Sequence, residues 1–287
     1  MTKLRIVTDG AADMPANWEK QYDIHILPIP VQLAGQSLFL PDPQISVHQF
    51  YKMIREYREV PRSSLPSIAH ITDFYRSIAQ KGDEILSIHV ASKMSGTFSV
   101  IQNVANELKD EFKISPFDSG AGSAVLGFMC RQARCLSNLG ISTEKIVQQL
   151  EIAKQNLAIY LTLDNLEFAR LSGRVNALQT TLSSLLRIKP IIELKEGILQ
   201  IAGRVRTRGK AIEAMIDAIS EKITGNPMDI AVVHAEDFET ALEIKNKISG
   251  IFTDFQIYIS ELALPVASNL GPGTVGIVLY PVDKVID

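Results

Sequence analysis

The sequence predicts an α/β protein of two domains, with a mostly parallel α/β/α sheet domain packed on an α+β domain that has a mixed sheet. Over residues 1–156, short apolar runs alternate with amphipathic segments, as in a parallel sheet flanked by helices. Over residues 157–287, several strand-like runs follow one another without a helix between them, which indicates antiparallel pairing. A chain of 287 residues is long enough for two such domains, and we place their boundary near residue 157.

The first domain begins directly with a strand and then alternates between helices and strands. Helices are expected where apolar residues recur every three or four positions, as Phe50, Ile54 and Tyr57 do. Prolines and serines interrupt this pattern at 61–67, so we expect an ordered loop there. The expected strands are 4–8, 24–29, 85–90 and 112–117, and the expected helices are 16–22, 47–57, 71–79, 96–108, 124–139 and 142–156.

The second domain changes this rhythm. The short turn Lys195-Glu196-Gly197 joins two apolar runs and predicts a β-hairpin. Helical patterns are fewer here than in the first domain, and strand patterns lie close together. The expected strands are 159–163, 188–194, 198–202, 229–234, 255–261 and 275–280, and the expected helices are 178–186, 211–223 and 240–248.

Charge and composition exclude several classes of function. The formal net charge is −3 and no cluster of five or more basic residues occurs, so we expect no nucleic-acid partner. No apolar run approaches the roughly 18 residues that span a bilayer, and the N-terminus shows no apolar leader. Cys130 and Cys135 lie five apart in an expected helix, hence on different faces, so we expect reduced thiols packed in the interior. We therefore expect a cytoplasmic protein without an integral membrane segment.

Familiar catalytic and nucleotide-binding motifs are absent from the sequence. A Walker loop, a dinucleotide-binding fingerprint and a nucleophile elbow each need glycine spacings that do not occur here. The histidines form no HExxH motif or clustered ligand set, so we expect no metal and no cofactor.

The segment Ser95-Gly96-Thr97 stands between an expected strand and an expected helix. Three uses compete for it: a phosphate loop, a serine nucleophile, or a cradle for another anion. A helix N-terminus suits an anion because its unpaired N–H groups and the positive end of the helix dipole point outward. Capping of the helix by Ser95 explains the same residues without a ligand. The hydroxyl-rich segments 63–67 and 268–273 have similarly plain explanations as a loop and a Gly-Pro-Gly turn.

Charged residues give equally open signals. Asp9, Asp13 and Asp118 lie at or just beyond strand ends, where carboxylates are catalytic, bind metals or cap the following helix. We expect structural roles for Asp9 and Asp118. Arg174 is either a surface residue or an anion clamp.

Eight segments occur in one order along almost the whole chain. They are Asp9-Gly10-Ala11-Ala12-Asp13, Leu27-Pro28-Ile29-Pro30-Val31, Ser63-Ser64-Leu65-Pro66-Ser67, Ser92-Lys93-Met94-Ser95-Gly96-Thr97, Asp118-Ser119, Leu166-Glu167-Phe168-Ala169-Arg170-Leu171-Ser172-Gly173-Arg174, Lys189-Pro190-Ile191 and Gly271-Pro272-Gly273. Together they resemble the DegV family of bacterial fatty-acid-binding proteins. No single segment is decisive, but eight in register make the resemblance specific.

The resemblance implies a DegV-like fold with a long-chain fatty acid in a tunnel between the two domains. It also implies that side chains of Ser63, Ser95, Thr97 and Asn269 bind the carboxylate, and that Ser64, Gly96, Arg174, Gly271 and Gly273 support the head group or line the mouth. Some family members present the acid to a separate ATP-dependent kinase subunit, which forms an acyl phosphate. A carrier that is not itself an enzyme is therefore expected, with a fatty acid kinase subunit as a candidate partner.

The sequence departs from the family's usual residues near the head group. Serine replaces the usual threonine at Ser63, alanine replaces serine at Ala91, and Leu270 replaces threonine. Asn269 replaces the usual histidine, and an amide donates hydrogen bonds but cannot carry charge or exchange a proton. This departure bears mainly on coupling to a kinase. Two alternatives stay open: a serine- or aspartate-dependent hydrolase or transferase, and a binding protein for another lipid-like anion.

Overall fold

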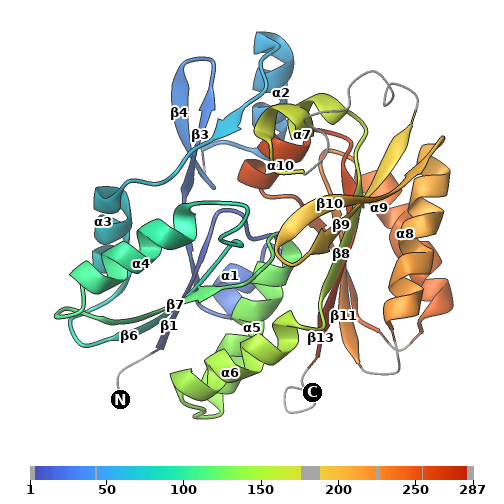
Figure 1. Ribbon diagram of the computed structural model, residues 1–287. Coiled ribbons are helices and arrows are strands. Elements are labelled where there is room, and N and C mark those ends of the chain that lie inside the picture. The colour runs from blue at the N-terminus through green and yellow to red at the C-terminus, as the bar shows by residue number, and fades with distance from the viewer. Residues whose placement is uncertain (1–3, 43, 176–187, 224–226, 254, 283–287) are drawn as a thin grey trace.

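Two β-sheets lie side by side and α5 (Ala124–Asn138) packs between them, in contact with a strand of each (Figure 1). The computed structural model describes residues 4–42, 44–175, 188–223, 227–253 and 255–282. One sheet is wholly parallel and the other is mixed, so the predicted fold class is confirmed. The predicted helix at 178–186 lies outside the described residues.

The parallel sheet has the strand order β2-β1-β6-β7 and is built from the first part of the chain. Helices α3 and α4 pack beside each other and contact this sheet. The elements are β1 Leu4–Asp9, α1 Trp18–Gln21, β2 Ile24–Leu27, α3 Ile68–Ile78, β6 Glu84–His89, α4 Thr97–Glu107, β7 Lys113–Asp118 and α6 Thr143–Lys154. Helix α3 begins at Ile68, three residues before the predicted start, because the Ser67 side chain caps it by accepting from the N–H of His70 (3.1 Å).

A small antiparallel sheet with the order β4-β3-β5 was not predicted. The predicted strand 24–29 divides at Pro28, which has no N–H with which to continue a ladder, so its second part joins this other sheet. The prediction of a loop at 61–67 is wrong for Arg62 and Ser63, which form a short strand that pairs with β3. The elements are β3 Ile29–Leu33, β4 Gln36–Leu40, α2 Val47–Tyr57 and β5 Arg62–Ser63.

The mixed sheet has the order β10-β9-β8-β13-β11-β12, in which only β11 and β12 are parallel. The predicted hairpin at Lys195-Glu196-Gly197 is confirmed by the pairing of β9 with β10. Two short helices, α7 and α10, were not predicted; α10 includes the first part of the stretch at 268–273 that was expected to form only a turn. The elements are β8 Ala158–Thr162, α7 Leu166–Ser172, β9 Lys189–Lys195, β10 Ile198–Val205, α8 Arg208–Lys222, β11 Met228–His234, α9 Phe238–Ile251, β12 Ile257–Glu261, α10 Leu264–Leu270 and β13 Val275–Pro281.

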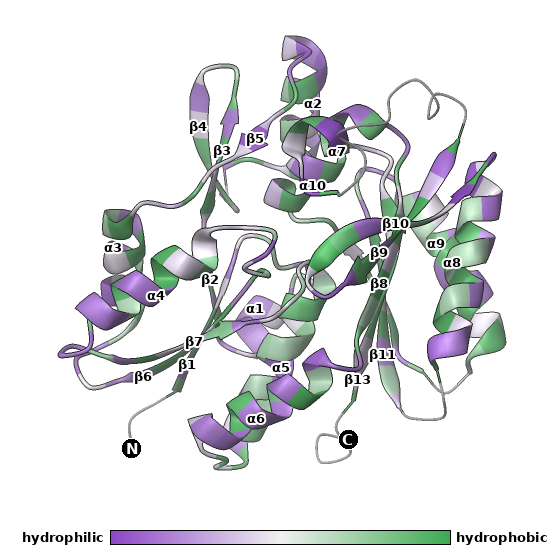
Figure 2. Ribbon diagram, viewed as in Figure 1, coloured by the Kyte–Doolittle hydropathy of each residue, from purple (hydrophilic) through white to green (hydrophobic). Residues whose placement is uncertain are grey.

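The buried core forms three layers, which follow from the alternation of side chains along the strands. Ala158 and Tyr160 of β8 point to the layer beneath α8 and α9, while Ile159 and Leu161 point to the layer between the two sheets. A third layer, which includes Tyr75 of α3, covers the other face of the parallel sheet. Hydrophobic residues accordingly dominate the middle strands of the mixed sheet, such as β8 and β13, whereas the outer helices carry both hydrophobic and hydrophilic residues (Figure 2).

Contacts between the two large sheets hold the halves of the chain together. Arg131 of α5 forms an ion pair with Asp229 of β11 and donates to the hydroxyl of Tyr258 at 3.1 Å. Its guanidinium also lies 5.0 Å from the ring centre of Trp18, a cation–π contact. The parallel sheet ends before residue 157 and the mixed sheet begins after it, so we keep the division into 1–156 and 157–287 as a proposal.

Several expectations from composition can be compared with the described residues. Cys130 is buried and Cys135 is half-buried, and both thiols are free. Among the helices described, none combines the length and apolar character needed to cross a bilayer. Within the described ranges, no three His, Cys, Asp or Glu side chains gather closely enough to hold a metal ion.

Candidate functional site

A cavity lies between the two sheets, and an interface between two packed parts of a protein is a common place for a small-molecule site. Most of its wall is apolar. Ile159, Leu161 and Val233 face it from the mixed sheet, because they are the side chains of β8 and β11 that point away from α8 and α9. Leu194 and Leu199 contribute from the hairpin of β9 and β10. The cavity can therefore take an aliphatic group.

Polar side chains from distant parts of the chain line the same cavity. Ser63 comes from β5, Ser95 and Thr97 from the start of α4, and Asn269 from α10. All four residues that the sequence suggested for carboxylate binding therefore lie around one space. Thr97 is buried, whereas Ser63, Ser95 and Asn269 are half-buried, so this part of the cavity lies near the surface.

These polar groups pair with one another, and one of the pairs crosses between the two halves of the chain. The Nδ2 amide of Asn269 lies 3.3 Å from Ser63 Oγ and donates to the carbonyl of Pro265 at 2.7 Å. The hydroxyls of Ser95 and Thr97 are 2.9 Å apart. Hydroxyl and amide groups of this kind can turn to donate to an anion.

The start of α4 differs slightly from the prediction. Gly96, not Ser95, is the N-cap residue, and it has no side chain with which to satisfy the first N–H groups. Ser95 Oγ instead accepts weakly from the Thr97 N–H at 3.3 Å. The helix spans 11 residues, and its positive dipole end lies beside the Ser95 and Thr97 hydroxyls.

Arg174 supplies the positive charge of the cavity wall. It follows α7, which ends at Gly173 in a left-handed conformation (φ 72°), and its guanidinium donates to the carbonyl of Ser172. Burial lowers the pKa of Arg174, because the charged form loses contact with water. Among the described residues no carboxylate forms an ion pair with it.

The other supporting residues suggested by the sequence do not line the cavity: Ser64 and Gly96 are exposed, Gly273 is half-buried and Gly271 is buried. Ser64 bonds to the carbonyl of Pro30 through its N–H (2.8 Å), and Gly96 packs against Leu65. Gly271 (φ 87°) sits directly on the ring of Phe168, where a Cβ would come within 2.8 Å of ring carbons. Gly273 (φ 76°) donates its N–H to the carbonyl of Ala235 at 2.8 Å.

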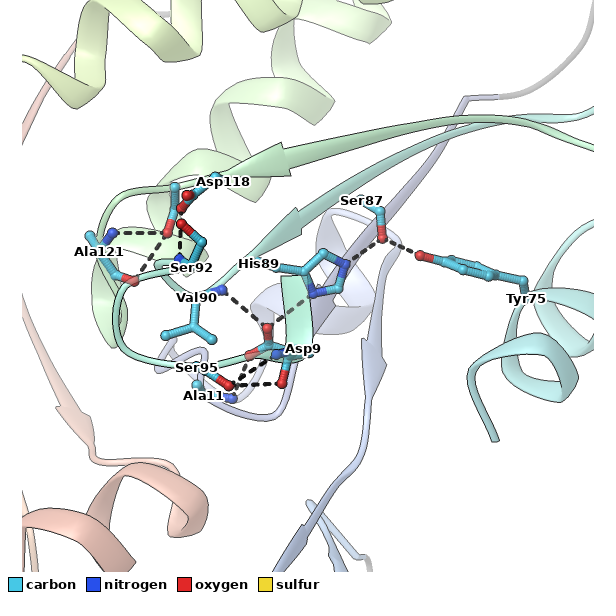
Figure 3. Close-up of polar contacts among 12 residues, drawn as sticks. Asp9, Ala11, Tyr75, Ser87, His89, Val90, Ser92, Ser95, Asp118 and Ala121 are labelled. Atoms are coloured by element: carbon cyan, nitrogen blue, oxygen red, sulfur yellow. Dashed lines mark hydrogen bonds and ion pairs between the residues drawn. The ribbon is translucent and has the colours of Figure 1, made fainter. Parts of the chain in front are cut away.

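Sequence reasoning missed a buried network behind the Ser95 loop (Figure 3). His89 Nδ1 lies 3.0 Å from Asp9 Oδ2, and its Nε2 lies 2.7 Å from Ser87 Oγ. Ser87 Oγ in turn lies 2.8 Å from the hydroxyl of Tyr75. All four side chains are fully buried. A lone histidine in an apolar strand gives no motif, so only the alternation of Ser87 and His89 on one face of β6 could have indicated their proximity.

Asp118, Thr274 and Asp13 hold backbone segments around the cavity or lie between the two halves of the chain. Asp118 accepts from the N–H groups of Ser92 (3.2 Å) and Gly120 (2.9 Å), a structural role of the kind expected. Thr274, also missed, lines the cavity and donates to the carbonyl of Gly271 at 2.7 Å. Asp13 is buried between the two halves of the chain, and burial raises its pKa to about 7.

Comparisons with known proteins agree with this geometry. The profile of the DegV family, described as uncharacterised proteins, matches residues 3–282. Protein DegV of Bacillus subtilis is 29% identical over 276 residues, which cover 96% of this chain and 98% of that protein. The crystal structure of DegV, a fatty acid binding protein from Bacillus subtilis, superposes with a TM-score of 0.87 at 28% identity and covers 98% of this chain and 100% of that one. A DegV family protein from Thermus thermophilus, described by its fatty acid binding, gives a TM-score of 0.87 at 26% identity with the same coverage.

Proposed function

The chain belongs to the DegV family, and on that premise we propose that it binds a long-chain fatty acid in the cavity between its two sheets. One observation carries the proposal. Neutral donors from β5, α4 and α10 converge with Arg174 on one cavity whose remaining wall is largely apolar. A ligand that matches this wall has a small anionic head and a long aliphatic tail. Fatty acid binding in the structurally similar proteins supports the same ligand class.

The two parts of the ligand would contribute in different ways. Each methylene group removed from water adds about 0.8 kcal/mol, so the tail supplies most of the affinity. The head group then needs orientation and partners for its oxygens. Ser63, Ser95, Thr97 and Asn269 would donate hydrogen bonds, and the N-terminus of α4 together with Arg174 would stabilise the charge.

The same arrangement supports a carrier more than a serine hydrolase. Ser95 Oγ pairs with the Thr97 hydroxyl, and its described contacts include no imidazole that would take up its proton. Ser87 does contact a histidine that contacts an aspartate, but neither Ser87 nor His89 lines the cavity, and Ser87 Oγ also lies 2.8 Å from the hydroxyl of Tyr75. We also propose that the bound acid is presented to a separate kinase subunit, since three of the four head-group residues are only half-buried.

The test is mass spectrometry of an organic extract of the purified protein, followed by titration of the delipidated protein with palmitate and oleate. The expected result is a co-purifying fatty acid and saturable binding of at least one of the two acids. Absence of both would sink the proposal. Turnover of generic esters that disappears in Ser95→Ala would favour the hydrolase instead. Acyl phosphate formed only when the loaded protein, ATP and a kinase subunit are combined would establish presentation.

A further inference from the structure

Asp9 is among the residues that line the cavity, which under the proposed function receives a carboxylate. Its side chain comes from the end of β1 and is fully buried. Two negative charges close to each other in a space with little water repel strongly. The partners of Asp9 therefore bear on whether the cavity accepts an acid at all.

Three N–H groups occupy the two oxygens of Asp9 (Figure 3). The backbone N–H of Ala11 donates to Oδ1 at 3.0 Å, and that of Val90 donates to Oδ2 at 3.1 Å. His89 Nδ1 supplies the third contact, to Oδ2 at 3.0 Å. Donors placed in this way fix the orientation of the carboxylate and offset its charge.

His89 is itself held by a chain of hydroxyl groups. A carboxylate only accepts hydrogen bonds, so Nδ1 of His89 donates to Asp9. On its other side, Nε2 lies within hydrogen-bond distance of the Ser87 hydroxyl, which in turn contacts the hydroxyl of Tyr75. One line of polar contacts therefore joins α3, β6 and β1.

The two backbone N–H groups belong to segments that shape the cavity. Ala11 and Val90 both line it, and Val90 begins the loop that carries Ser95 to the start of α4. Asp9 thus ties the loop after β1 to the loop after β6. If Asp9 turned, its charge and both segments would move relative to the Ser95 and Thr97 hydroxyls.

We propose that His89 is a positioning residue for the anionic head group: it holds Asp9 against the N–H groups of Ala11 and Val90, which offsets the Asp9 charge and keeps both cavity segments in place. The proposal rests on fatty acid binding as the function. It predicts an effect on recognition of the ligand's charge, whereas a merely structural histidine would affect all ligands alike.

The test compares palmitate with methyl palmitate, which has the same tail and no charge, in the wild type and in His89→Gln. Loss of a contact to a charged group is worth a factor of about ten, so palmitate affinity should fall about tenfold in the variant. Methyl palmitate affinity should change by less than about twofold. The ratio of the two affinities is the readout.

His234→Gln is the matched control. His234 is also buried at the end of a strand, but its described polar contact is with the Asp237 N–H (3.4 Å) and it does not line the cavity. Its affinity ratio should equal that of the wild type. If circular dichroism shows that His89→Gln does not fold, Ser87→Ala carries the test, because it removes the hydroxyl that holds His89 and should lower the ratio about threefold.

The outcomes separate the two proposals. A wild type that binds neither ligand overturns the proposed function. A wild type that binds palmitate, with a ratio unchanged in His89→Gln or with both ligands weakened equally, overturns only the positioning role of His89. A selective loss of palmitate binding in His89→Gln, with the ratio kept in His234→Gln, supports it.

Discussion

Asn269 and Ser63 lie 206 positions apart in the chain, yet their side chains meet at the polar part of the cavity. The amide of Asn269 is also fixed by the carbonyl of Pro265 one helical turn earlier. This residue therefore connects α10, in the second half of the chain, to β5 in the first. Of its two amide N–H groups, one donates to the Pro265 carbonyl and the other reaches Ser63; in the proposed function the second faces the ligand.

Replacing Asn269 with alanine should weaken palmitate binding about fivefold, because one hydrogen bond of about 1 kcal/mol is lost. Asn269→His should bind like the wild type at pH 8, where imidazole is neutral, and more tightly at pH 6, where imidazolium adds a positive charge. Titration at both pH values measures the effect. Equal affinities of wild type, Asn269→Ala and Asn269→His at pH 6 would show that this position does not meet the head group.

Among the residues of the site, the sequence indicated some far better than others. Ser95 and Thr97 could be placed at a helix N-terminus from pattern alone, but their use as a cap or an anion site could not be decided. Their convergence with Ser63 and Asn269 was expected only from the family resemblance, because strands and helices alone do not specify which distant loops meet. His89 was overlooked because the side chains of its network are distributed over three elements, α3, β6 and β1.

At the scale of elements, helices and strands with strong periodicity were predicted well and short ones were not. The apolar runs that became β1, β6 and β8 are long enough to identify by pattern. Helices α7 and α10 have only seven residues each, which is too short for periodicity to stand out. One predicted strand is divided between two sheets at Pro28, because proline has no N–H to continue the hydrogen-bond ladder. The sequence pattern does not show which sheet the residues after Pro28 join.

The turn after α10 is an element whose geometry admits only glycine. Gly271→Ala should lower the free energy of unfolding by about 2 kcal/mol or more, because φ is 87° and a Cβ would lie 2.8 Å from the Phe168 ring. Urea unfolding measures the loss. Gly209→Ala is the control, since Gly209 lies in α8 with open space around it and should gain about 0.5–1 kcal/mol. Equal stabilities of the two variants would contradict this account of the turn.

At the scale of the whole molecule, Asp13 joins the two halves of the chain. Its Oδ1 accepts from the N–H of Ala263 at 2.6 Å, immediately before α10, and its Oδ2 accepts from the hydroxyl of Ser123 at the start of α5. Burial is the largest influence and raises its pKa to about 7, against the lowering effect of both hydrogen bonds. The folded protein therefore holds a proton there that the unfolded chain releases at lower pH.

The contribution of Asp13 to the free energy of unfolding should consequently decrease as the pH rises from about 4 to about 7. Below the pKa of Asp13 in the unfolded chain, the residue is protonated in both states and its stabilising contribution is complete. That contribution is lost as the pH rises through the pKa of about 7 in the folded protein. The difference in unfolding free energy between wild type and Asp13→Asn should shrink with pH by at most about 1.4 kcal/mol per unit. Urea unfolding at pH 5, 6, 7 and 8 measures it. The exposed Asp110→Asn is the control for net charge, and a pH-independent difference for Asp13→Asn would refute the coupling.

One face of the mixed sheet is at once part of the hydrophobic core and part of the cavity wall. A tail bound in the cavity would therefore lie inside the hydrophobic core. Ile159 and Leu161 belong to the buried core and also line the cavity, so a ligand there would pack against core side chains. Under the proposed function the ligand packs against this core only in the folded protein, so ligand binding stabilises the folded state. At a free ligand concentration of one hundred times Kd the loaded form gains about 2.7 kcal/mol over the empty one. Thermal unfolding of the delipidated and the loaded protein would measure this difference. In a cell, the less stable empty form would be degraded faster, so the amount of the protein would depend on how much fatty acid is available.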